Sequence, residues 1–148
     1  MPKFYTGIGS TETPKESLDL MFQIAVKLAK QGVVLRSGGG GGGDMAFEFG
    51  CNSAKGMKEL YWPYQSTDQS FDIVAPYINM DAITNKYDKS VIGCTPLKLL
   101  GMSLDSPSTC LLCYNNNIAM KVAQQFNIPV YNLSDKEVFN KWVKWVNT

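Results

Sequence analysis

Six consecutive glycines at residues 38–43 separate an apolar segment from the start of an expected helix. The apolar segment, residues 33–35, is short and fully hydrophobic, which is typical of a strand buried on both faces of a parallel sheet. The helix is expected to begin near Asp44. A strand, a glycine-rich loop and a helix in this order form the repeating unit of a parallel α/β sheet, whose ligands bind beyond the carboxyl ends of the strands. The glycine run therefore constrains the fold and the position of a site together.

The remaining segments alternate between strand and helix patterns. Strands are expected at residues 4–10, 58–62, 109–114 and 128–131, and apolar residues three and four apart predict helices at residues 13–32, 118–126 and 138–146. Residues 65–104 are less regular, although residues 96–100 are compatible with a short helix. The 148 residues suffice for one domain. We expect residues 1–148 to form a single α/β domain, a Rossmann-like three-layer fold with a mainly parallel sheet.

Two sequence patterns predict where helices begin. Thr13-Pro14-Lys15-Glu16 is a capping box with Thr13 as the N-cap, and Ser134-Asp135-Lys136-Glu137 is a second one. The face that the first helix buries is expected to contain Leu18, Met21, Phe22, Ala25, Leu28 and Ala29.

Composition excludes several kinds of chemistry. The chain has no histidine, so Ser-His-Asp and Cys-His catalysis and histidine-ligated metal sites are excluded, and we expect neither a metal nor a cofactor. The net charge of +1 makes a nucleic-acid partner unlikely. No apolar run reaches the roughly 18 residues of a membrane helix.

The cysteines and the first three residues indicate the cellular compartment in which we expect the protein. Met1-Pro2-Lys3 leads directly into an expected strand, without a signal peptide, so we expect a cytoplasmic protein with reduced thiols. Cys110 and Cys113 form a CxxC pattern, but within a strand their side chains face opposite ways. We therefore interpret them as core residues rather than a redox pair.

The glycine run is the first candidate binding element. Glycines between a strand and a helix let backbone N–H groups approach a phosphate, and the helix N-terminus adds roughly half a positive charge. The alternative is a flexible connection. Since no Gly-Lys-Ser/Thr sequence follows, the run is not the P-loop of nucleoside triphosphatases. The candidate ligand-binding residues here are Ser37, Gly38, Gly39, Gly40, Gly41, Gly42, Gly43 and Asp44.

Charged residues flank the run on both sides. Arg36, the only arginine, offers a planar fork for phosphate or carboxylate, the alternative being a surface ion pair. Asp44 and Glu48 share one helix face. Either could hydrogen-bond ribose hydroxyls or stabilise a cationic sugar during N-glycosidic cleavage, or both could simply oppose the helix dipole. Asp44 and Glu48 are thus the candidate catalytic residues if the protein is an enzyme.

Other expected loops reach the same sheet edge. They contribute Gly9 and Ser10 after the first strand and the aromatic ring of Trp62 after the third. Asn115, Asn116 and Asn117 precede a helix, which needs only one asparagine as its cap and leaves further amides for a ligand.

Four segments carry a family resemblance, namely Tyr5-Thr6-Gly7-Ile8-Gly9-Ser10, Leu35-Arg36-Ser37-Gly38-Gly39, Asp44-Met45-Ala46-Phe47-Glu48 and Ile128-Pro129-Val130-Tyr131-Asn132-Leu133. They resemble the SLOG superfamily, above all small stand-alone members common in phage genomes. That superfamily includes the Lonely-guy phosphoribohydrolases and the DNA-processing protein A group. The resemblance implies a Rossmann-like fold, a nucleotide-type ligand over the glycine loop, frequent homo-oligomers and, for a phage protein, the host cytoplasm. The hydrolases' second signature, Pro-Gly-Gly-x-Gly-Thr with a following glutamate, is absent, since residues 114–117 occupy its place.

These observations favour a protein that senses or sequesters a nucleotide or nucleotide-derived molecule, including one derived from NAD or a cyclic nucleotide. The first alternative is an N-glycosidase acting on nucleoside monophosphates, and the second is a single-strand DNA accessory protein. The near-neutral charge argues against the last, because such grooves need many cations.

Overall fold

The computed structural model describes residues 3–38 and 43–148. Its centre is a five-stranded, all-parallel sheet in the order β3-β2-β1-β4-β5. Four strands are shorter than the sequence predicts, whereas β2 begins one residue later than predicted and is one residue longer. They are β1 Phe4–Ile8, β2 Val34–Ser37, β3 Lys58–Leu60, β4 Leu111–Cys113 and β5 Val130–Asn132. The chain builds outward from β1 to β3 and then crosses to β4, so the strand order reverses between β1 and β4.

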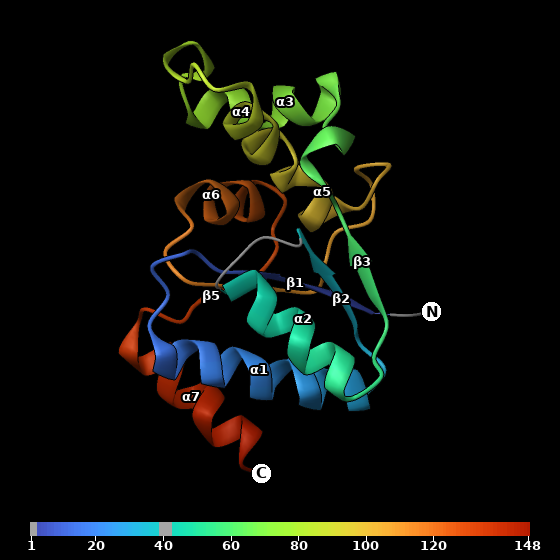
Figure 1. The fold of residues 1–148 in the computed structure, drawn as a ribbon, viewed down its shortest axis with the longest axis vertical. Helices are drawn as coiled ribbons and strands as arrows, with labels where there is room; N and C mark the ends of the chain where they lie inside the picture. The colour runs from blue at the N-terminus through green and yellow to red at the C-terminus, as the bar shows by residue number, and fades with distance from the viewer. Residues whose placement is uncertain (1–2, 39–42) are drawn as a thin grey trace.

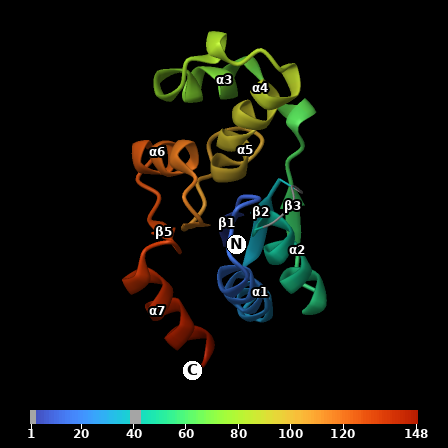
Figure 2. The ribbon, with the colours of Figure 1, turned by 60° about the vertical axis from the view of Figure 1, so that its left-hand side comes forward.

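Helices cover both faces of the sheet, which confirms the expected Rossmann-like α/β architecture (Figures 1 and 2). One face carries α1 Lys15–Lys30, α2 Gly43–Ser53 and α7 Lys136–Val146. The other carries α5 Thr95–Leu100 and α6 Asn117–Gln125, the first of which confirms the expected short helix. The irregular segment forms α3 Asp68–Val74 and α4 Lys86–Gly93, with short 3-10 turns, and lies beyond α5 (Figure 2).

Two apolar clusters fill the space between the layers. Tyr5, Leu35 and Leu112 face α1 and α2, whereas Leu111 and Cys113 face α5 and α6. Helix α1 buries Leu20, Met21, Ile24, Ala25 and Leu28. The expected face was partly wrong, because Phe22 is 38% exposed. Apolar residues occupy more than half of the circumference of α1, so several stripes satisfy the same spacing and packing selects among them.

Both capping boxes differ from the prediction by one residue. Pro14 is the N-cap of α1, and Thr13 Oγ1 instead accepts from Ser10 N at 3.0 Å and donates to Ser10 O at 2.9 Å. Asp135 caps α7, since its Oδ1 accepts from the backbone of Glu137 at 2.9 Å. In both cases the hydroxyl of the predicted cap is used elsewhere, by Thr13 on Ser10 and by Ser134 on Asn115 in the loop after β4.

The CxxC cysteines face opposite sides of the sheet, as predicted: Cys110, just before β4, packs on the α1 side, and Cys113, within β4, belongs to the α6 side. Both are free thiols, and burial raises the pKa of each to about 11. A thiolate is therefore scarce at neutral pH, which supports the packing interpretation. Within the described ranges, no helix is long and apolar enough to cross a membrane.

Candidate functional site

The end of β1 and the start of α2 meet through their backbones at the carboxyl edge of the sheet. A Cβ atom on Gly9 would lie 2.1 Å from Cα of Gly43, so neither position tolerates a side chain without a shift. The N–H of Gly9 donates to Oδ1 of the buried Asp44 at 2.8 Å. Asp44 thereby ties the first turn of α2 to the end of β1.

A buried lysine lies beside Gly38, the first glycine of the run and the last residue described before Gly43. Lys98 on α5 is only 7% exposed. A Cβ atom on Gly38 would meet Lys98 Nζ at 2.5 Å and Asp44 Oδ2 at 3.5 Å, so the ammonium and the carboxylate both flank this backbone. The Lys98 backbone is fixed by its carbonyl, which accepts from Thr6 Oγ1 at 2.6 Å.

The Lys98 ammonium makes no polar contact with the described parts of the chain. No hydrogen bond or ion pair joins it to residues 3–38 or 43–148, whereas Arg36 pairs with Glu59. Since the Tyr5 hydroxyl is the fully buried, unpartnered polar side-chain atom among the described residues, the Lys98 ammonium keeps some contact with solvent. A charge that is largely withdrawn from solvent is stabilised when a bound anion pairs with it.

Lys98 opens onto a small pocket of about 80 Å³. The pocket lies between α2, α4, α5 and the loop after β3, and it is lined by Gly38, Asp44, Tyr61, Pro63, Tyr87, Val91, Cys94 and Lys98. A water molecule takes about 30 Å³ and whole ligand pockets usually about 300–1,000 Å³. The pocket therefore fits a compact group, such as the anionic end of a larger ligand, whose remainder would lie outside it.

Apart from Lys98 and Asp44, the walls of this pocket are uncharged at neutral pH. The pKa of the Cys94 thiol is raised, mainly by burial. The nearby Lys98 ammonium partly opposes this rise, and the Asp44 carboxylate adds to it. Desolvation, together with the hydrogen bond to Glu59, raises the pKa of Tyr61 to about 12. Lys98 is consequently the one positive charge among the lining residues that the structure describes.

Arg36 lies inside the fold. Its guanidinium is 2% exposed, pairs with Glu59 at 3.1 Å, and stacks over the Phe4 ring at 4.0 Å. It also donates to Ser106 O, Ser106 Oγ and Ser108 Oγ. The guanidinium thus makes four hydrogen bonds to protein acceptors. This corresponds to the ion-pair alternative of the sequence analysis, except that the pair includes a buried arginine and does not lie wholly at the surface. Its predicted role in ligand binding stays a prediction.

The other predicted residues on this side of the sheet differ in how buried they are, and Ser37, Ser10 and Trp62 do not line the Lys98 pocket. Ser37 is fully buried and its Oγ donates to Glu48 Oε2 at a long 3.5 Å. Ser10 belongs to the turn before α1. Trp62 is 40% exposed and lies between two residues that line the Lys98 pocket without lining it itself. Gly39, Gly40, Gly41 and Gly42 lie outside the described residues.

The asparagine run lies at the other end of the carboxyl edge, away from Lys98. Asn116 caps α6 by accepting from Ala119 N at 3.0 Å, as its sequence position predicted. Asn115 bonds to the loop after β5, accepting from Ser134 Oγ at 2.6 Å. The structure thus brings together Gly9, Gly38, Gly43 and Asp44, and leaves the asparagines apart.

Lys98 is the residue that the sequence analysis missed. It is the single charged residue in residues 91–104, an otherwise apolar or small stretch. A lone charge in a segment that must be buried is a recognisable signal. Tyr87 and Cys94 gave no comparable signal.

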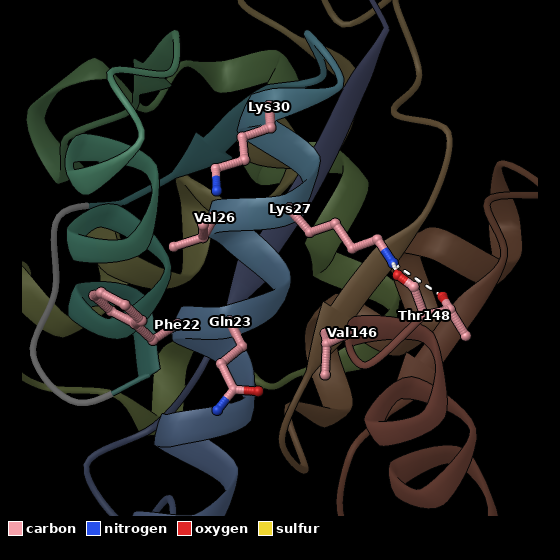
Figure 3. Close-up of a pocket in the computed structure, with 7 residues that line it drawn as sticks. All are labelled: Phe22, Gln23, Val26, Lys27, Lys30, Val146 and Thr148. Atoms are coloured by element: carbon pink, nitrogen blue, oxygen red, sulfur yellow. Dashed lines mark hydrogen bonds between the residues drawn. The ribbon is translucent and has the colours of Figure 1, made fainter.

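A larger groove of about 370 Å³ lies between α1 and α7, away from the carboxyl edge (Figure 3). Figure 3 shows Lys27 reaching across to Thr148, whose Oγ1 accepts from the ammonium at 3.0 Å. The same ammonium donates to Trp145 O and lies over the Trp145 ring. Because these contacts hold the two helices together, the groove is explained by helix packing.

Comparison of the chain with protein families, with curated proteins and with solved structures gives no match. The description of the parallel sheet and of the candidate site therefore rests on the residues and contacts of this chain alone.

Proposed function

We propose that this protein binds a nucleotide or nucleotide-derived small molecule, and that Lys98 holds its anionic group beside the glycine segment. The observation that carries the proposal is Lys98, a residue only 7% exposed whose ammonium opens into the pocket and has no hydrogen-bond or ion-pair partner in the described parts of the chain. A phosphate oxygen in the pocket would supply the missing charge and accept its hydrogen bonds.

The surroundings of Lys98 favour a phosphate over other small anions. Gly38 places backbone directly against the ammonium, and α2 begins at Gly43 with its N-terminus toward the same edge. Backbone N–H groups at the start of a helix are good phosphate donors. The resemblance to the SLOG superfamily indicates the same class of ligand, while Arg36 is not needed for the proposal.

An N-glycosidase acting on nucleoside monophosphates remains the second candidate. Asp44 favours it, because this carboxylate lines the Lys98 pocket. Glu48 lies beside Ser37 and is absent from that lining. If the protein only binds, nucleotides incubated with it are recovered intact. Free base that accumulates with wild type but not with Asp44→Asn would establish hydrolysis.

Thermal melts with a panel of nucleosides and their phosphates test the binding proposal. We expect a phosphorylated nucleotide to raise the melting temperature and its parent nucleoside to do so less, because bound ligand stabilises through mass action. Lys98→Met should weaken binding at least about tenfold, in keeping with the loss of a charged hydrogen bond. The exposed Lys86→Met on α4 is the matched control. Equal affinity in the Lys98 and Lys86 variants would contradict the proposal.

A further inference from the structure

A second pocket, of about 320 Å³, lies at the other end of the carboxyl edge. It is bounded by the first turns of α1 and α7 and by the loops that follow β4 and β5. Its lining residues are Glu16, Ser17, Tyr114, Leu133, Ser134, Lys136, Phe139 and Asn140. This volume falls within the range of pockets that hold small molecules. It is close to the crossing from β1 to β4, where open α/β sheets bind ligands.

Ser17 is the least exposed polar residue that lines this pocket. The residue is 3% exposed, and its hydroxyl has no hydrogen-bond partner within residues 3–38 and 43–148. In the described residues, the buried side-chain atom sealed from both solvent and partners is the Tyr5 hydroxyl, and Ser17 Oγ is not. The Ser17 hydroxyl therefore opens into the pocket, where it can donate one hydrogen bond and accept others.

The loops that form the pocket wall are fixed by hydrogen bonds to each other. Asn115 N donates to Asn132 Oδ1 at 3.0 Å, and Asn132 Nδ2 donates to Asn115 Oδ1 at 3.1 Å. Ser134 Oγ donates to the same Asn115 oxygen at 2.6 Å. This network holds Tyr114 and Ser134 in place before any ligand arrives, which lowers the entropic cost of binding.

The chemistry of the walls selects an uncharged, flat ligand. Tyr114, Leu133 and Phe139 provide apolar and aromatic surface that belongs to the core cluster on this face. The charges of Glu16 and Lys136 are opposite, and both side chains are exposed at the rim. Exposed charges contribute little, so the buried hydroxyl and the rings determine what fits.

We propose that this pocket is a second binding site, for an uncharged heteroaromatic ring of nucleobase or nucleoside size. The ring packs between Tyr114 and Phe139, and its edge hydrogen-bonds to the Ser17 hydroxyl and to the Asn140 amide at the rim. The proposal stands independently of Lys98, because none of the residues that line one pocket lines the other.

The test is a titration of the ¹⁵N-labelled protein with free nucleobases and uncharged nucleosides. We expect amide shifts at Tyr114, Ser134 and Asn140, and little change at Gly38. Ser17→Ala should weaken the binding about tenfold, as expected for one hydrogen bond. Asn140→Ala, at an exposed position, should weaken it in the same direction and provides a second variant if Ser17→Ala does not fold.

Lys98→Met is the control that separates the two sites, and it should leave nucleoside binding unchanged. Absence of binding at millimolar nucleobase and nucleoside would overturn the proposal. So would binding that Ser17→Ala and Asn140→Ala leave intact, or binding that disappears in Lys98→Met. Zwitterionic aromatic amino acids are the competing occupant, and shifts with these alone would show that the rim charges select the ligand instead.

Discussion

At the scale of single residues, Arg36 and Lys98 show that the role of a buried charge depends on whether it has protein partners. Both side chains are buried, at 2% and 7% exposure. The guanidinium of Arg36 is surrounded by protein acceptors, whereas the ammonium of Lys98 has no hydrogen-bond or ion-pair partner among the described residues. The arginine was conspicuous in the sequence because of its rarity, but the paired charge serves the fold and the unpaired one marks the pocket.

Arg36→Met should therefore lower stability, and should affect ligand affinity less than Lys98→Met does. The loss of hydrogen bonds from a charged group predicts a decrease of roughly 1.5–3 kcal/mol in the free energy of unfolding. Urea denaturation measures it. A fully stable Arg36→Met protein that no longer binds nucleotide would instead place Arg36 in the site.

Tyr5 offers the opposite prediction. Its hydroxyl is buried with no hydrogen-bond partner among the described residues, and burial raises its pKa well above the usual range. Tyr5→Phe keeps the edge-on ring contact with Phe47 and removes the unsatisfied group. We expect the free energy of unfolding to rise by about 1 kcal/mol. A decrease would mean that the hydroxyl has a partner in solution.

At the scale of elements, the sequence located helices better than it located their ends. The α1 and α7 patterns were recognised from their apolar spacing, yet each cap lies one residue after the predicted one. Thr13 and Ser134 have the side chains that a cap requires, but Ser10 and Asn115 engage their hydroxyls. Such competition between nearby acceptors is set by tertiary contacts and is not visible in a local pattern.

Two alanine variants distinguish the cap of α7 from its neighbour. Asp135→Ala should lower the free energy of unfolding by about 0.5–2 kcal/mol, because the backbone N–H groups of Glu137 and Val138 lose their acceptor. Ser134→Ala removes only an exposed hydrogen bond and should cost less. Denaturant melts compare the two, and a larger effect at Ser134 would restore the capping box predicted from the sequence.

At the scale of the whole molecule, alternation of apolar strands and amphipathic helices was enough to predict the parallel sheet. The glycine run also predicted that Gly38, Gly43 and Asp44 lie at the carboxyl edge of the sheet, where the structure brings them together with Gly9. Lys98, Tyr87 and Cys94 were missed because they come from the irregular residues 65–104. That segment has no strong period, so only the folded chain shows that α4 and α5 close the pocket.

The two thiols of β4 predict how stability depends on pH across the whole domain. Burial raises the pKa of Cys110 and Cys113 to about 11 in the folded protein, against about 8.5 for an ordinary thiol. Above the lower value the unfolded chain loses these protons first, so the free energy of unfolding should fall between about pH 8.5 and pH 11. In a Cys110→Ala Cys113→Ala variant, the free energy of unfolding measured by denaturation should fall less steeply with pH across this range. An identical dependence on pH in the variant and in wild type would contradict the raised thiol pKa values.

The central claim is that a phosphorylated nucleotide binds with its anionic group at Lys98. Amide NMR during titration with a nucleotide and with its parent nucleoside tests it most directly. The nucleotide should shift the amides of Gly9, Gly38, Asp44 and Lys98, the nucleoside should leave them nearly unchanged, and Lys98→Met should abolish the difference. If no nucleotide shifts these amides, or if the shifts fall only around the α1–α7 groove of Figure 3, the account is contradicted.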